Sequence, residues 1–362
     1  MNVFTEEARK QSFSIPLHAL RGIAAVLVLL CHIQMRINEG LPDFSFDRIF
    51  NGSGAVTFFF VLSGLVVGAA LAKHEINFAT VSLYLHRRFF RIMPLLFVTV
   101  TIGGFYLLFI NDSMRFSLYD RAYGDFSLTK FVSAYVGYSL KPNQPIWSIY
   151  IEIIASLLIP LMVLSGSKYR YILLTLAICV AFSLVNYEFQ HRWNFYMISF
   201  YIGLTVLLWG KGLASILSRM PNAIYWSLVF TLFLLFYLAR LVTGAGYGDI
   251  WIVYWETATI APLVAMIYYM PDKFSFLNKP IFIFLGDISY SLYLTHWILL
   301  ALALNYVTAW LGTGAIALVV FCTTSIIVSL LVAAVSYQKI ELGGIKLGEA
   351  MRRTPKPIQH LS

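Results

Sequence analysis

Ten apolar stretches of about the length of a membrane-spanning helix dominate the chain and leave few residues for any other structure. Hydrophobic residues form 59% of the 362 residues and charged residues only 12%, a balance outside the usual range of soluble domains. The stretches are residues 15–36, 53–72, 92–110, 146–165, 170–185, 193–210, 223–241, 250–270, 281–304 and 314–336. We therefore predict an all-α, polytopic integral membrane protein with about ten transmembrane helices.

Two weak segments leave the helix count open by one. Residues 170–185 are short for a span, and residues 128–140 form an aromatic segment of the kind that can be re-entrant. The longest interval between spans, residues 111–145, is too short to bury a core of its own. We therefore predict one transmembrane domain, residues 1–338, followed by a short cytoplasmic tail, residues 339–362.

Lysine and arginine in the loops predict the orientation, because basic residues are retained on the cytoplasmic side. With an even number of spans both termini share one side, and that side carries most of the 26 Lys and Arg residues. We therefore predict that both termini are cytoplasmic. This topology explains the net charge of +9, so the composition indicates no nucleic-acid partner. The three cysteines lie inside predicted spans, so no disulfide framework is expected.

Arg21 and His32 are ionisable residues inside the first apolar stretch. A charge at the bilayer centre costs about 2.5–3.5 kcal/mol on insertion scales, so Arg21 should face a polar partner or a cavity rather than lipid. On a helix, their separation returns to nearly the same face and places them roughly 16 Å apart. The two residues therefore predict a polar path through the protein and no direct contact with each other.

Three arginines, Arg87, Arg88 and Arg91, form a cluster just before the third stretch. Residues three and four apart on a helix share a face, so these side chains can present guanidinium groups to one anionic ligand. Anchoring to lipid phosphates at the cytoplasmic surface is the more common reason for such a cluster. The density of charge alone does not identify a ligand.

A serine and a carboxylate in two other spans are further candidates. Ser63 lies in a helix rich in small residues, where packing is its simpler role and bonding across a helix contact the other. The fourth stretch begins at Trp147 and Ser148 and places Glu152 about two turns inside the membrane. This carboxylate can neutralise a buried arginine, take up a proton or orient an imidazole. Glu256, which lies less deep, is the competing acidic candidate.

The ninth stretch carries Tyr290, Tyr293 and His296. Tyr293 and His296 are three residues apart and share a helix face, so they can line a pocket or complete a set of interhelical hydrogen bonds. No His, Cys and carboxylate set shows metal-ligand spacing, and neither a phosphate-binding glycine loop nor a serine-hydrolase elbow is present. We expect no metal site.

Taken together, these segments resemble membrane-bound acyltransferase family 3, whose members transfer acyl groups to sugars and other acceptors. The resemblance covers most of the chain and rests on motifs that occur in the family's order. They are Arg21 with His32, Phe59-Phe-Val-Leu-Ser-Gly64, the arginine cluster ending in Arg91-Ile-Met-Pro94, Trp147-Ser-Ile-Tyr-Ile-Glu152, and Ile288-Ser-Tyr-Ser-Leu-Tyr-Leu-Thr-His296.

The chain departs from the family pattern at two positions. Thr57 stands where many members have an acid before the paired phenylalanines, and the family's late Glu-x-Pro motif occurs as Glu341-Leu-Gly343. We expect neither departure to touch the chemistry that the resemblance implies. The soluble esterase-like domain that is fused to some relatives is absent from this sequence.

The resemblance implies a membrane-bound O-acyltransferase in the bacterial cytoplasmic, or inner, membrane. Such an enzyme takes an acyl group from cytoplasmic acyl-CoA and passes it to a hydroxyl group of a sugar or glycan on the other side of the lipid bilayer. Acetyl is the default group because it is the commonest in the family, so acetyl-CoA is the expected co-substrate. No permanently bound cofactor is expected.

The resemblance also implies roles for individual residues. His32 would act as the base that removes the hydroxyl proton, with Glu152 as its orienting carboxylate; alternatively, His32 would carry the acyl group covalently. Arg21, Arg87, Arg88 and Arg91 would surround the phosphates of the coenzyme. The cavity would be lined by Ser63, Trp147, Ser148, Tyr290, Tyr293 and His296.

A transporter or flippase for a lipid-linked saccharide is the main alternative, because it also needs buried charges and a cavity. The sequence shows no internal repeat of the kind that many transporters carry. A purely structural membrane protein gives no reason to keep Arg21 within a span. The sequence leaves open the acceptor, the acyl chain length and the oligomeric state.

Overall fold

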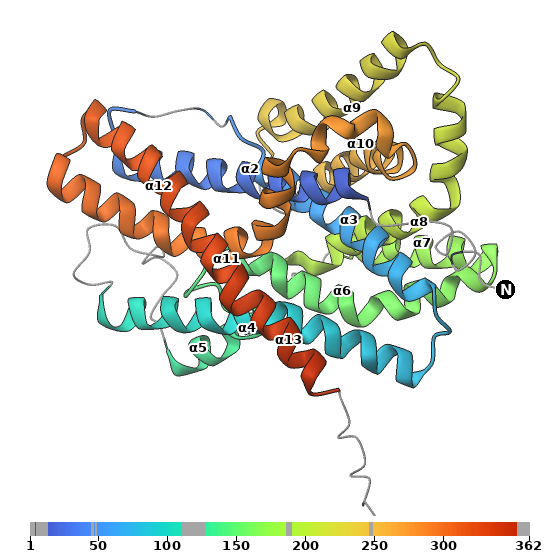
Figure 1. Cartoon of the computed structure of the whole chain (residues 1–362), viewed down its shortest axis with the longest axis horizontal. Helices are drawn as coiled ribbons and strands as arrows, with labels where there is room; N and C mark the ends of the chain where they lie inside the picture. The colour runs from blue at the N-terminus through green and yellow to red at the C-terminus, as the bar shows by residue number, and fades with distance from the viewer. Residues whose placement is uncertain are drawn as a thin grey trace, which may run out of the picture.

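The computed structural model describes residues 4, 14–44, 47, 49–110, 127–185, 190–245 and 249–352. Within these ranges every regular element is a helix and no strand occurs, so the predicted all-α fold is confirmed (Figure 1). The longer helices are α2 (Ile15–Gly40), α3 (Gly52–Ala72), α4 (Phe78–Phe109), α6 (Ile146–Leu164), α7 (Tyr169–Ser183), α8 (Trp193–Leu217), α9 (Asn222–Thr243), α10 (Ile250–Tyr269), α11 (Pro280–Leu311) and α12 (Ala315–Ser336).

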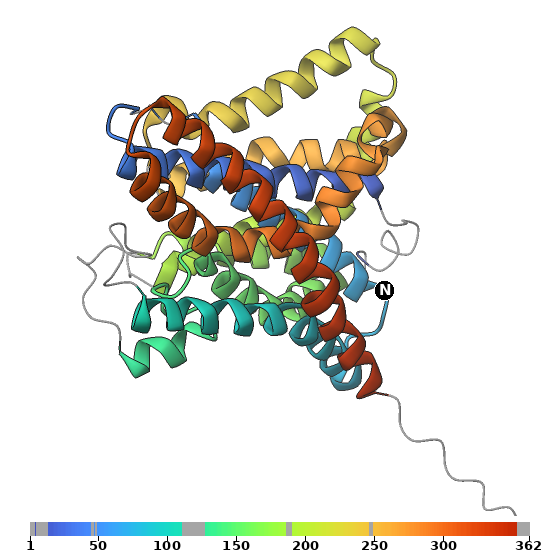
Figure 2. The ribbon, with the colours of Figure 1, turned by 60° about the vertical axis from the view of Figure 1, so that its left-hand side comes forward.

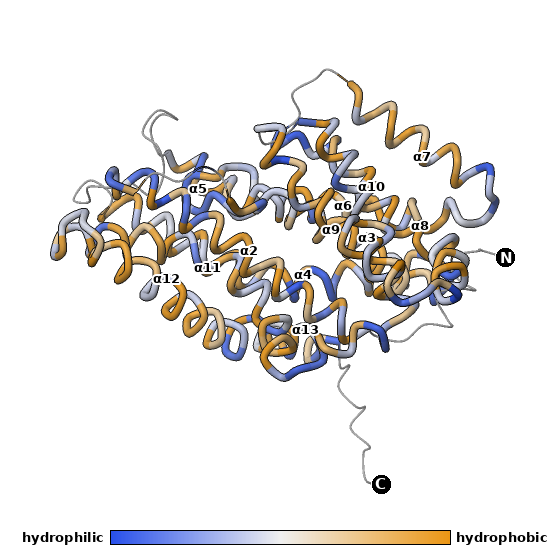
Figure 3. The backbone as a smooth tube through the Cα atoms, turned by 90° about the horizontal axis from the view of Figure 1, so that it is seen from above, coloured by the Kyte–Doolittle hydropathy of each residue, from blue (hydrophilic) through white to orange (hydrophobic). Residues whose placement is uncertain are grey.

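In this part of the chain, nine helices are long and apolar enough to cross a membrane. They match the predicted spans except residues 170–185, where α7 has only 15 residues. Hydrophobic residues follow the outward-facing helices α7 and α12 (Figure 3). The weak segment at residues 128–140 contains α5 (Leu128–Ala134), whose seven residues are too few to span. The chain is therefore a polytopic integral membrane protein, as predicted.

Helix α4 begins at Phe78, well before the predicted start of the third span at residue 92. The side chain of Asn77 caps this helix by accepting a hydrogen bond from the backbone N–H of Thr80 at 2.9 Å. The first half of this helix contains arginines and is not apolar, so the predicted apolar stretch did not include it. The arginine cluster therefore lies inside a continuous helix and not at the entrance of one.

The helix of the last predicted span continues beyond residue 338. Helix α12 continues through a π-helix (Tyr337–Glu341) into α13 (Leu342–Ala350). Helix α13 crosses α4, where a side chain added at Gly344 would collide with the backbone oxygen of Phe90 (Figures 1 and 2). The predicted boundary between domain and tail therefore falls inside one continuous helix that stays packed on the bundle.

Two close helix contacts form the centre of the bundle. Helix α2 packs along α11, and Gly22 allows its backbone to touch that of α11. Helix α3 packs along α8, with Gly64 against the carbonyl of Phe200 and Gly203 against the carbonyl of Val61. Small residues at such contacts let membrane helices approach closely. These two contacts place α2, α3 and α11 around one internal space.

Candidate functional site

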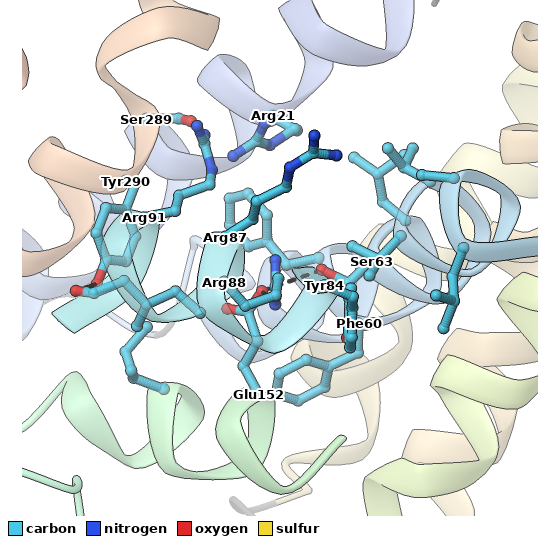
Figure 4. A pocket seen from close by; sticks show the side chains of 18 of the residues that line it. Arg21, Phe60, Ser63, Tyr84, Arg87, Arg88, Arg91, Glu152, Ser289 and Tyr290 are labelled. Atoms are coloured by element: carbon cyan, nitrogen blue, oxygen red, sulfur yellow. Dashed lines mark hydrogen bonds and ion pairs between the residues drawn. The ribbon is translucent and has the colours of Figure 1, made fainter. Parts of the chain in front are cut away.

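A cavity of about 640 Å³ lies between α2, α3, α4, α6 and α11 (Figure 4). Most of the predicted site residues line it, although they come from distant parts of the chain. They are Arg21, Ser63, Arg87, Arg88, Arg91, Ser148, Glu152, Tyr290 and Tyr293. The lining does not include the other predicted residues, namely His32, Trp147 and His296.

Arg88 is paired with the carboxylate of Glu152. The distance from Arg88 Nη2 to Glu152 Oε1 is 2.6 Å, and Arg88 Nε donates to Ser156 Oγ at 3.2 Å. Ser63 Oγ donates to the same oxygen of Glu152 at 3.3 Å. Ser63 thus bonds across a helix contact, and Glu152 has the role of neutralising a buried arginine.

Arg91 faces a carboxylate that the sequence analysis placed outside the site. Its Nη2 atom is 3.3 Å from Glu341 Oε1, and Ser291 Oγ donates to Glu341 Oε2 at 3.1 Å. Glu341 is fully buried and belongs to the π-helix, a distortion that is frequent at functional sites. The altered Glu-x-Pro motif therefore supplies the partner of a cluster arginine, a contact that the sequence did not predict.

Arg21 and Arg87 add positive charge to the cavity without a direct contact to a carboxylate in the described part of the chain. Among the residues that the structure describes, neither guanidinium forms an ion pair or a hydrogen bond, whereas Arg88 and Arg91 do. Figure 4 shows Arg21, Arg87 and Arg91 at one end of the cavity, while Arg88 turns toward Glu152. Guanidinium groups bind phosphates and carboxylates through paired hydrogen bonds. This end of the cavity is therefore suited to an anionic ligand.

His32 forms a close pair with His296. Its Nδ1 atom lies 2.7 Å from His296 Nε2, and the two rings are nearly parallel, with an interplanar angle of 13°. The rings of Trp297 and His32 form a T-shaped pair with a centroid distance of 5.0 Å. The predicted orienting partner, Glu152, does not contact His32, because its carboxylate is held by Arg88. The residue that contacts and orients His32 is His296, on α11.

Tyr293 lies between the cavity and the histidine pair. It lines the cavity, and its ring contacts that of His296 at a centroid distance of 6.2 Å. Its hydroxyl accepts a hydrogen bond from Ser148 Oγ at 2.7 Å and donates to the carbonyl of Pro145 at 3.1 Å. Tyr293 and Ser148 thus close the inner end of the cavity. Trp147 contacts Phe60 beside the cavity without lining it.

The structure adds polar residues that the sequence analysis did not single out. His18 Nε2 lies 3.0 Å from Asp287 Oδ1, and both residues line the cavity. Tyr84 also lines it, one helical turn before Arg88. The sequence offered one signal for His18. It precedes Arg21 by nearly one turn of the same helix, so the two residues share a face.

Glu256, the competing acidic candidate, belongs to a separate buried network. Arg240 binds it with two contacts, Nε to Oε1 at 2.7 Å and Nη2 to Oε2 at 3.1 Å. Thr57 Oγ1 donates to Glu256 Oε2 at 2.8 Å, and neither Glu256 nor Arg240 lines the cavity. This ion pair joins α9 to α10 and is a structural contact.

The bundle and its cavity define a class: an integral membrane protein whose internal cavity is arranged for an anionic ligand, with a histidine pair behind its inner end. The family model described as an acyltransferase domain, that of acyltransferase family 3, matches residues 16–334. Because the match covers most of the chain, the chain belongs to this family and is a membrane acyltransferase. No curated protein and no solved structure matches it.

Proposed function

We propose that this acyltransferase moves an acetyl group from cytoplasmic acetyl-CoA to a hydroxyl group of a sugar or glycan on the extracytoplasmic side of a bacterial inner membrane. One observation carries the proposal. Arg21 and Arg87 have no direct carboxylate contact in the described part of the chain, and they line a cavity whose inner end, Tyr293, contacts the histidine pair. The phosphates of coenzyme A are the natural ligand for such guanidinium groups.

The direction of transfer follows from the topology. The arginine end of the cavity lies near the start of α2, where Arg21 is in the second turn. The excess of basic residues in the loops favours the side on which α2 begins as the cytoplasmic one. Along α2, His32 lies roughly 16 Å further into the membrane than Arg21. The pantetheine arm of a coenzyme bound by the arginines would extend toward His32.

The proposed chemistry needs one base and one thioester. Neutral His32 takes the proton of the acceptor hydroxyl while the hydroxyl oxygen attacks the thioester carbonyl. The carbon–sulfur bond then breaks, and the departing thiolate recovers the proton from His32. In a second route, His32 attacks the thioester first and passes the acyl group on from its imidazole. Both routes require Tyr293 to move aside, because its ring closes the cavity.

The test is transfer of radiolabelled acetyl from acetyl-CoA to cell-envelope glycan, in membranes that carry the wild type or His32→Ala at equal protein levels. We expect the variant to lose the transfer, by about 100-fold or more, because it lacks the base. His86→Ala is the matched control, since His86 bonds the carbonyl of Gly348 and does not line the cavity.

The outcomes separate the possibilities. Loss in His32→Ala together with activity in His86→Ala supports the proposal and identifies the acceptor fraction. Equal transfer by the wild type and His32→Ala would remove His32 from the chemistry. Absence of transfer in every sample, together with no binding of acetyl-CoA by the purified protein, would overturn the proposed donor.

A further inference from the structure

His296 has a contact that defines where its proton lies. Its Nδ1 atom is 2.9 Å from the backbone carbonyl of Leu292 on the same helix. A carbonyl oxygen can only accept a hydrogen bond, so Nδ1 of His296 carries the hydrogen. A neutral imidazole has one N–H, and therefore its Nε2 atom holds a lone pair.

The lone pair of His296 decides the protonation of His32. His296 Nε2 and His32 Nδ1 are 2.7 Å apart, which is a hydrogen-bond distance. Because His296 Nε2 accepts, His32 Nδ1 must donate. Neutral His32 then has its hydrogen on Nδ1 and a free lone pair on Nε2, which is the state that a base or a nucleophile requires.

Burial and packing favour one arrangement of the pair. His296 is 1% exposed, whereas His32 is half-buried, so the more accessible ring is the one with the free nitrogen. Burial of an imidazole disfavours its charged form, because the charge loses contact with water. Both imidazoles are therefore neutral in the resting enzyme.

We propose that His296 is a positioning residue, which selects the tautomer of His32 with an unprotonated Nε2 atom. It also provides a place for charge during turnover. When His32 Nε2 takes the hydroxyl proton, its Nδ1 proton can shift to His296 Nε2, so that the positive charge is shared by two rings. The link to acyl transfer rests on the proposed function, but the assignment of the tautomer does not.

Two substitutions separate this role from support of the helix. In His296→Gln, the side-chain oxygen reaches the position of Nε2 and can accept from His32 Nδ1. In His296→Asn, the shorter amide can donate to the carbonyl of Leu292 but does not reach His32. The inference predicts that His296→Asn lowers kcat by about 100-fold or more with an unchanged KM for acetyl-CoA, while His296→Gln stays within about tenfold of the wild type. A residue that only supports the helix would give the opposite order, or equal losses.

The second measurement does not depend on activity. Nitrogen-15 NMR of protein with labelled histidine reports which ring nitrogen is protonated, and His32→Ala identifies the signals of His32 among the seven histidines. We expect a proton on His32 Nδ1 and a nitrogen–nitrogen coupling to His296 that disappears in His296→Asn. A proton on His32 Nε2 in the wild type would overturn the inference. If no sample transfers acetyl, the spectrum still decides the tautomer, and only the proposed function fails.

Discussion

At the scale of single residues, the four arginines of the cavity divide into two kinds. Arg88 and Arg91 each form an ion pair with a carboxylate, while Arg21 and Arg87 form none within the described ranges. The first kind holds α4 against its neighbours, since Glu152 and Glu341 come from other helices. The second kind is available to a ligand, and its removal should affect binding more than folding.

Arg87→Ala should raise the KM for acetyl-CoA by about tenfold with little change in kcat. A hydrogen bond to a charged group contributes about 1.5–3 kcal/mol, and each 1.4 kcal/mol corresponds to tenfold in binding. Initial rates at varied acetyl-CoA concentration measure the effect. Arg170→Ala, on the exposed part of α7, is the control and should leave KM unchanged. Equal KM values for Arg87→Ala and the wild type would show that Arg87 does not bind the donor.

The residue scale is also where prediction from the sequence succeeds and fails most clearly. The membrane cost of a charge identified Arg21, and the arginine cluster identified three further residues that line the cavity. The partners could not be predicted, because Glu341 and His296 meet Arg91 and His32 through contacts between helices. A periodic pattern describes one helix and contains no information on which residue of another helix lies opposite.

At the scale of helices, α3 and α8 approach more closely than ordinary side chains allow. A side chain at Gly64 would collide with the backbone of Phe200, and one at Gly203 would collide with the backbone of Val61. Backbone atoms cannot turn away as a flexible side chain can. This contact therefore depends on glycine at both positions.

Gly203→Ala should destabilise the protein by about 1–3 kcal/mol, because extra volume in a packed contact forces the backbones apart. Gly212, on the same helix, has no atom within 4 Å of an added side chain. Gly212→Ala should instead be neutral or stabilising by up to about 1 kcal/mol, since alanine favours the helix. Thermal unfolding in detergent measures both. A Gly203→Ala protein as stable as Gly212→Ala would contradict the close contact.

The helices themselves were predictable because most of them consist of one apolar run of sufficient length. The predicted helix bounds were wrong for two helical segments that contain polar residues. The first half of α4 carries arginines that line the cavity, and the extension of α12 passes through polar residues into α13. Hydropathy identifies what contacts lipid, and these two segments contact other protein segments or the cavity instead.

At the scale of the whole molecule, the two ends of the bundle differ in chemistry. The arginine end includes the cavity and the start of α4 at Phe78, whereas α11 ends at the opposite side near Trp310. The proposed direction of transfer requires the first end to be cytoplasmic. Both Phe78 and Trp310 are highly exposed, at 90% and 83%, so cysteines at these positions can be labelled.

We expect Trp310→Cys to react with a membrane-impermeant maleimide in intact cells, and Phe78→Cys to react only after the membrane is permeabilised. The reason is the retention of basic residues on the cytoplasmic side. The native cysteines lie within helices, so the unmodified protein measures the background. The reverse pattern of labelling would place the arginine end outside and remove acetyl-CoA as the donor.

The continuous helix from α12 to α13 has a practical consequence for truncating this enzyme and for aligning its sequence with those of relatives. The family match ends at residue 334, yet Glu341, which faces Arg91, comes after that limit. A protein shortened to the matched domain would keep the arginine and lose its carboxylate. Purification tags are best placed beyond Ala350, and alignments of relatives should extend past the domain edge, so that this carboxylate is included in any comparison of specificity.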